Sequence, residues 1–170
     1  IVSFTGASPW SVFAQGIYLN TGFSIGIVTI LISGVVLIFW IPLNQKLGIG
    51  TVLNALIIGL MIDVCIKFVP TPENYISQLL LALLAVLTVG LGGGIYLIAN
   101  LGPGPRDGLM IGLQEKTHFP IAIVRAFLEI AVVSLGWYLG GIVGIGTILF
   151  ACGIGPAVAF GLFIVKKIYN

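Results

Sequence analysis

The sequence predicts an all-α membrane protein, an inverted repeat of three plus three transmembrane helices whose first helix is largely missing from this chain. Two observations lead to this prediction. The hydrophobic fraction is 59% and only 7% of the residues are charged, whereas soluble domains carry about 25% charged residues. The chain also repeats itself at an offset of 96 residues, with about 19 identities in about 65 positions between Gly6/Gly102 and Val69/Val165.

Composition excludes several classes of function. The formal net charge is only +2, so nucleic acid is not expected as a partner. The chain has one histidine, His118, and two cysteines, Cys65 and Cys152, without a CxxC pair or a His/Cys cluster. We therefore expect no metal and no cofactor. Neither a nucleophile–histidine pair nor a catalytic carboxylate pair is recognisable, so an enzyme is not expected and no catalytic residue is assigned.

Apolar stretches place the transmembrane helices. A span needs about 20 apolar residues, and five stretches qualify: 22–41, 49–69, 79–100, 120–139 and 145–165. Pro42 and Pro70 follow the first two, as helix stop signals do. Ile1 aligns with Leu97, near the end of the third stretch, so we expect the chain to begin in the last turn of a helix.

Two further segments predict short half-helices, at residues 8–20 and 104–117. Each begins with small residues and proline, which favours a helix start. About ten helical residues rise only about 16 Å, too little to cross a bilayer. We interpret both segments as re-entrant half-helices, with amphipathic surface helices as the alternative. The first repeat is then residues 1–70 and the second is residues 71–170, joined by the polar turn 70–74.

Basic residues predict the orientation. If the C-terminal Lys166-Lys167 is cytoplasmic, alternation of the spans brings most other basic residues to the same side, and only Lys67 falls near the opposite face. This is a positive-inside pattern. We therefore expect a multi-pass protein of the bacterial cytoplasmic (inner) membrane with a cytoplasmic C-terminus.

Charged residues in the second half indicate a polar site. Arg106 and Asp107 begin the second half-helix, where they either cap a solvated helix end or face a cavity that binds an anion. Arg125 and Glu129 lie four residues apart on one span, with Glu129 near the midplane by helical rise. A charge at this depth is costly in lipid. The pair therefore locks helix packing, coordinates a substrate or carries a proton, or combines these roles.

Polar residues on the second predicted span are less specific. Asp63 and Lys67 are also spaced four apart and form either a structural pair or part of the site, and Asn54 lies on the same span. The repeat equivalents of Arg125, Glu129 and Asp63 are Thr29, Ser33 and Ala159. The charges are therefore not duplicated, which predicts one off-centre polar site.

Glycine-rich segments lie within two of the predicted spans. Gly92–94 and 153–156 either allow close helix packing or unwind their helices along a cavity.

Several motifs resemble a bacterial family of integral membrane proteins, the YczE-like group, which is itself similar to YitT-type membrane proteins. The most specific motifs are 101–107 (LGPGPRD), Val124-Arg125 with Glu129, Gly136-Trp137, Gly140-Gly141, 144–147 (GIGT) and 153–156 (GIGP). In the first half the resemblance includes Ser8-Pro-Trp10, 48–51 (GIGT), Asn54, Gly59 and Asp63. The family commonly has aspartate after Pro-Trp, where this chain has Ser11. The resemblance implies a six-helix inner-membrane protein and implies no substrate.

Our leading hypothesis is a transporter for a small molecule or ion, anionic or zwitterionic, with its site at the repeat interface. The candidate substrate-binding residues lie on the half-helices and the neighbouring spans: Ser8, Trp10, Asn54, Asp63, Gly104, Pro105, Arg106, Asp107, Arg125 and Glu129. Alternatives are a passive channel, a membrane-embedded substrate-binding subunit, and a non-transport assembly or export accessory. The accessory alternative predicts a dry, solid core around Glu129. Oligomeric state and any energising partner stay open.

Overall fold

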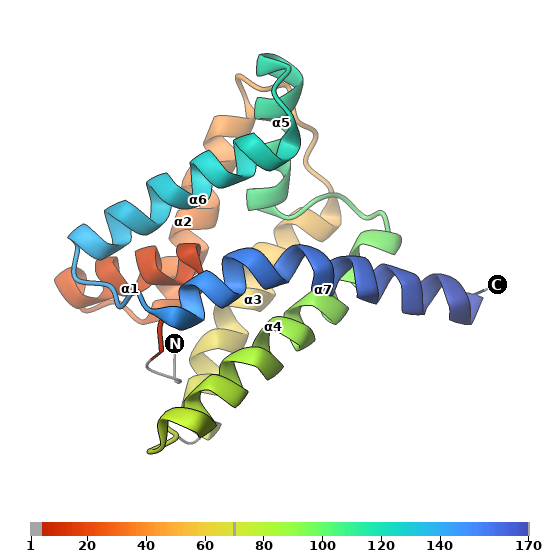
Figure 1. Ribbon diagram of the computed structural model, residues 1–170. Helices are drawn as coiled ribbons and strands as arrows, with labels where there is room; N and C mark the ends of the chain where they lie inside the picture. Colours follow the sequence, from red (N-terminus) through yellow and green to blue (C-terminus); the bar gives the residue numbers. More distant parts are fainter. Residues whose placement is uncertain (1–4, 70, 170) are drawn as a thin grey trace.

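The computed structural model describes residues 5–69 and 71–169, and over this part of the chain all regular structure is α-helical (Figure 1). The helices are α1 (Pro9–Thr21), α2 (Ile25–Trp40), α3 (Ile49–Phe68), α4 (Tyr75–Ile98), α5 (Pro105–Thr117), α6 (Ile121–Tyr138) and α7 (Ile145–Tyr169). The expected helix end at Ile1 and the stop signal Pro70 lie outside the described residues.

In the part of the chain that the structure describes, four helices are long and apolar enough to cross a membrane: α3, α4, α6 and α7. The mean hydropathy of their best windows is 1.7 to 2.4, and only 17% to 22% of those windows is buried within the protein. Most of their apolar side chains therefore face outward, as contact with lipid requires.

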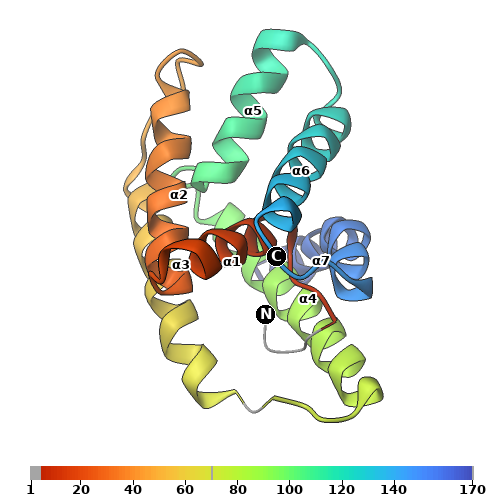
Figure 2. The same ribbon diagram turned by 90° about the vertical axis from the view of Figure 1, so that its left-hand side faces the viewer.

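The predicted span 22–41 is found as α2, which is shorter than predicted because the backbone turns at the start of this stretch. Gly22 has φ of +75° and its N–H donates to the Tyr18 carbonyl, which ends α1. Ser24 then caps α2, which has only 16 residues. The axes of α1 and α2 differ by 114°, so the pair forms either one broken span or a re-entrant turn (Figure 2). The helix predicted at 79–100 also begins earlier, at Tyr75, and ends at Ile98.

The short helices predicted at 8–20 and 104–117 are found as α1 and α5, each with 13 residues. Proline occupies the first turn of both, where its missing N–H costs no hydrogen bond. Whether they enter the membrane stays a prediction.

The two halves of the chain have matching helix starts and reciprocal contacts. α1, α2 and α3 begin 96 residues before α5, α6 and α7. The Gly50 N–H donates to the Leu101 carbonyl at 2.9 Å, and the Gly146 N–H donates to the Thr5 carbonyl at 2.7 Å. These two hydrogen bonds are also 96 residues apart. Each half therefore holds the segment that precedes the other half's short helix. The inverted orientation of the halves stays a prediction.

Glycines bring α4 and α7 into close contact. A Cβ atom on Gly90 would lie 2.2 Å from the Ala157 Cβ, and one on Gly94 would lie 2.6 Å from the Gly161 backbone. Both helices run unbroken through 92–94 and 153–156, so the unwinding expected as an alternative does not occur. Packing explains Gly90 and Gly94, whereas Gly92 and Gly93 line a cavity.

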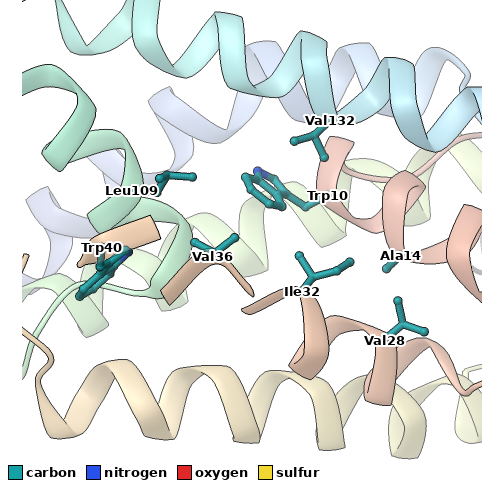
Figure 3. Close-up of a cluster of buried hydrophobic side chains, with 8 residues drawn as sticks. All are labelled: Trp10, Ala14, Val28, Ile32, Val36, Trp40, Leu109 and Val132. Carbon is teal, nitrogen blue, oxygen red and sulfur yellow. The ribbon is translucent and has the colours of Figure 1, made fainter. Parts of the chain in front are cut away.

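A core of buried apolar side chains holds the short helices against α2 and α6 (Figure 3). It comprises Trp10, Ala14, Val28, Ile32, Val36, Trp40, Leu109 and Val132. These residues come from α1, α2, α5 and α6. The core therefore fixes the first turns of α1 and α5 relative to the long helices.

Candidate functional site

A cavity of about 410 Å³ lies among the helices and is called the central cavity below. Its volume is within the range of about 300 to 1,000 Å³ typical of small-molecule sites. The central cavity includes both members of five pairs of positions 96 residues apart: Trp10/Arg106, Thr29/Arg125, Ser33/Glu129, Asn54/Phe150 and Ile58/Ile154. The cavity therefore lies at the interface of the two halves.

Two arginines and two carboxylates line the central cavity, so their formal charges balance. The Arg125 Nε donates to Glu129 Oε1 at 2.9 Å, which is the four-residue ion pair expected from the sequence. The side chains of Arg125 and Glu129 are 36% and 13% exposed. Since both also line the cavity, the pair locks one helix face while it remains next to any bound ligand.

Arg106 and Trp10 contact each other across the two halves. The Arg106 Cζ lies 5.0 Å from the centroid of the Trp10 ring, a cation–π geometry. Trp10 is only 7% exposed, and its Nε1 has no hydrogen-bond partner among the described residues. An unsatisfied buried donor costs about 1 to 3 kcal/mol. Such groups persist where function requires them, which makes Trp10 a candidate ligand contact.

Three side chains hold the segment that leads into α5. Tyr96 Oη donates to the Gly102 carbonyl at 2.6 Å, Thr51 Oγ1 to the Pro103 carbonyl at 2.7 Å, and Trp40 Nε1 to the Pro105 carbonyl at 3.0 Å. The three donors come from α4, α3 and α2. The first turn of α5 is therefore fixed from three directions, as a preorganised site requires.

The starts of α1 and α5 differ in their capping. The Ser8 Oγ accepts from the Ser11 N–H at 3.3 Å, so the side chain of Ser8 caps the N-terminus of α1. The equivalent residue before α5 is Gly104, which has no capping side chain. A Cβ on Gly104 would lie 3.1 Å from Asn54 Oδ1 and 3.2 Å from Asp107 Oδ2. Because Gly104 lacks that atom, two polar side chains converge on the start of α5, inside the cavity.

The structure brings together eight of the ten predicted site residues: Trp10, Asn54, Gly104, Pro105, Arg106, Asp107, Arg125 and Glu129. Ser8 and Asp63 do not line the central cavity. Asp63 accepts hydrogen bonds from Ser24 Oγ and the Gly26 N–H, and so ties the start of α2 to α3. No ion pair between Asp63 and Lys67 exists in the described structure. Asp63 therefore lies outside the central cavity and has a structural role at the start of α2, and its predicted part in substrate binding stays a prediction.

Several lining residues were not predicted: Thr29, Ser33, Tyr96 and Met110. A signal existed for Thr29 and Ser33, which are the repeat equivalents of Arg125 and Glu129. Tyr96 is on α4, which has no counterpart in the aligned repeat, so repeat alignment does not indicate it. Met110 is an apolar residue within a predicted helix, so nothing in the sequence distinguishes it from a packing residue.

A second cavity, of about 520 Å³, adjoins the first. Its lining includes Ser8 and Ser11 at the start of α1, together with the lower-numbered half of α4 and the higher-numbered half of α3. Ile58, Val89, Arg106 and Phe150 line both cavities.

Comparison with known proteins decides the family. Residues 1–162 match the model of a family of unknown function, DUF6198. The chain belongs to this family. A Haemophilus influenzae protein described as uncharacterized is 43% identical over 168 residues, covering 99% of this chain and 77% of that protein.

Two Bacillus subtilis proteins are also similar to this chain. The uncharacterized membrane protein YczE is 34% identical over 158 residues, covering 92% of this chain and 74% of YczE. The uncharacterized protein YyaS is 29% identical over 157 residues, covering 89% of this chain and 78% of YyaS. No solved structure matches. The YczE-like resemblance is thereby confirmed, and with its apolar helices this DUF6198 protein is a membrane protein.

Proposed function

We propose that this DUF6198 protein transports a small anionic or zwitterionic solute across the bacterial cytoplasmic membrane, with its binding site in the central cavity. The main observation behind this proposal is that five pairs of repeat-equivalent residues line the cavity. These pairs include Trp10, Arg106, Arg125 and Glu129. Transporters built from inverted repeats place their sites at the repeat interface near the bilayer midplane.

The charged side chains in the central cavity favour a functional role for this cavity. Ionisable groups within membranes are costly and mark ligand or proton pathways. In this proposal Arg106 attracts the negative group of the solute. Asp107 and Asn54, which converge on Gly104, bind its positive or hydrogen-bond-donating group. Glu129, held by Arg125, is the candidate proton carrier.

The cavity also weighs against the accessory alternative. That alternative predicted a dry, solid core around Glu129, whereas Glu129 lines an open space of about 410 Å³. A passive channel remains the competing function, since the two short helices would also suit a pore. Saturable flux that depends on a proton gradient distinguishes a carrier from a channel.

The test is uptake by proteoliposomes with radiolabelled phosphate, lactate, glycine and glutamate as probes. We expect saturable uptake of at least one probe, strongly reduced by Arg106→Ala and by Glu129→Gln. Glu115→Gln and Lys116→Ala are matched controls, because both residues are exposed and outside the cavity. Uptake that is unchanged in both cavity variants would remove the proposed site.

A further inference from the structure

The two cavities follow one another along α3 and α4, which are consecutive in the chain but stand apart, because α3 packs against α2 and α4 packs against α7. The central cavity contacts α3 at Asn54 and α4 as far as Tyr96, whereas the second cavity extends to Val69, directly after α3, and contacts α4 from Leu81. Because α3 and α4 are consecutive and run in opposite directions (Figure 2), the cavities occupy opposite ends of the pair. The second cavity lies at the end that carries the 70–74 connection.

The cavities meet near the middle of both helices. Ile58 and Val89 line both, and each lies close to the centre of its helix. From Asn54 to Val69 the helical rise is about 22 Å, compared with a hydrocarbon thickness of about 30 Å. Together the two spaces therefore extend along α3 for a distance equal to most of the hydrocarbon thickness.

Arg106 lies at the junction. It lines both cavities, and it is the one charged side chain that the described structure places on the second cavity. The guanidinium is held over the Trp10 ring, and Trp10 lines the central cavity but not the second. The Arg106–Trp10 contact is therefore made on the central side of the junction.

We propose that the second cavity is the vestibule through which solute reaches the central cavity from the 70–74 side of the membrane, and that Arg106, held on Trp10, closes the passage between them. This inference rests on the proposed transport function, because it assigns the entry route to the same site.

The chemistry of the vestibule selects its ligand. Its walls are mainly Ile, Val, Leu and Ala from α3 and α4, and its polar groups are Ser8, Ser11 and Arg106 near the starts of α1 and α5. A positive charge at the end of an apolar passage has little screening, so it attracts anionic groups and repels cations. A solute with a leading carboxylate or phosphate replaces the contact of Arg106 with Trp10 and thereby opens the passage.

Cysteine accessibility tests the route. In a Cys65→Ser, Cys152→Ser background, Ser11→Cys marks the vestibule and Asn54→Cys marks the central cavity. Right-side-out and inside-out vesicles are treated with anionic and cationic membrane-impermeant methanethiosulfonates. We expect Ser11→Cys to react from the 70–74 side, faster with the anionic reagent. Asn54→Cys should react slowly from that side.

Removing the closing residue should open the passage. Arg106→Ala should accelerate the reaction of Asn54→Cys from the 70–74 side by about tenfold, the factor expected for loss of an ordinary cation–π contact. Arg106→Lys is the control that keeps the charge. Size-exclusion profiles verify that each variant is folded.

Two results would overturn the route. One is a Ser11→Cys thiol that reacts only after denaturation, as it would if a further apolar helix filled the second cavity. The other is an Asn54→Cys rate that Arg106→Ala does not change. The labelling needs no transported solute. If the labelling is as expected but proteoliposomes take up none of the probes, the transport proposal fails and the connected passage stands.

Discussion

The Arg106 guanidinium lies 5.0 Å from the centroid of the Trp10 ring, and the two residues occupy equivalent positions in the two halves of the chain. Their partners differ sharply. Trp10 Nε1 has no hydrogen-bond partner among the described residues, whereas the second buried tryptophan, Trp40, donates to the Pro105 carbonyl. One indole nitrogen therefore supports the fold of α5, whereas the other is buried without a hydrogen bond to the described residues.

Trp40→Phe should destabilise the protein more than Trp10→Phe. Both changes remove the same volume from one core, but only Trp40→Phe breaks a hydrogen bond, the one to the Pro105 carbonyl, whereas Trp10→Phe removes a donor that has no partner among the described residues. We expect a difference of about 1 to 3 kcal/mol in the free energy of unfolding. Unfolding in mixed micelles followed by circular dichroism measures it. Equal losses would mean that the Trp40 hydrogen bond contributes nothing.

Arg125 and Glu129 should be energetically coupled. Each single change, Arg125→Leu or Glu129→Leu, leaves one charge in the cavity without its partner. The double variant should therefore be more stable than the sum of the single losses predicts, with a coupling energy of about 0.5 to 3 kcal/mol. A double-mutant cycle of unfolding free energies measures this. Strictly additive losses would show that the ion pair contributes no stability.

Asp63→Asn should reduce stability but leave transport per folded molecule unchanged. The carboxylate accepts from Ser24 Oγ and from the Gly26 N–H at 2.7 Å, so its loss weakens the start of α2. We expect a cost of about 1 to 3 kcal/mol. Lys67→Gln is the control, since Lys67 is exposed and unpaired in the described structure. Reduced uptake by fully folded Asp63→Asn protein would return Asp63 to the site.

Gly94→Ala should disrupt the contact between α4 and α7, whereas Gly92→Ala should not. A Cβ on Gly94 would lie 2.6 Å from backbone atoms of Gly161 and Leu162, and one on Gly92 meets nothing within 4 Å. Overpacking of this kind typically costs about 1 to 3 kcal/mol. Thermal unfolding in detergent compares the two variants. Because Gly92 lines the central cavity, solute uptake by the Gly92→Ala variant is measured separately from its stability.

Much of the fold was predictable because it depends on local pattern. Helix lengths follow from apolar runs, and the starts of α1 and α5 follow from proline after small residues. The extent of α2 is the exception. The apolar run 22–41 reads as one span, but Gly22 adopts a left-handed conformation and Ser24 restarts the helix, so α2 is shorter. An apolar run gives the approximate place of a helix but not the residue at which the helix begins.

The site was predictable where charge indicated it. Arg106, Asp107, Arg125 and Glu129 are conspicuous in an apolar chain, and all four line one cavity. Tyr96, Thr29 and Ser33 are not conspicuous, since single hydroxyl groups are common in membrane helices. Asp63 is equally conspicuous, but the structure places it outside the cavity, where its hydrogen bonds hold the start of α2.

The sequence by itself determined the membrane character, the 96-residue repeat and the second half as the location of the charges, because composition and internal similarity need no third dimension. Only the tertiary structure decided which residues meet. The pairing of Trp10 with Arg106, the two adjoining cavities and the structural role of Asp63 depend on how helices of one half pack against those of the other. Those contacts join residues far apart in the chain, and local sequence pattern carries no record of them.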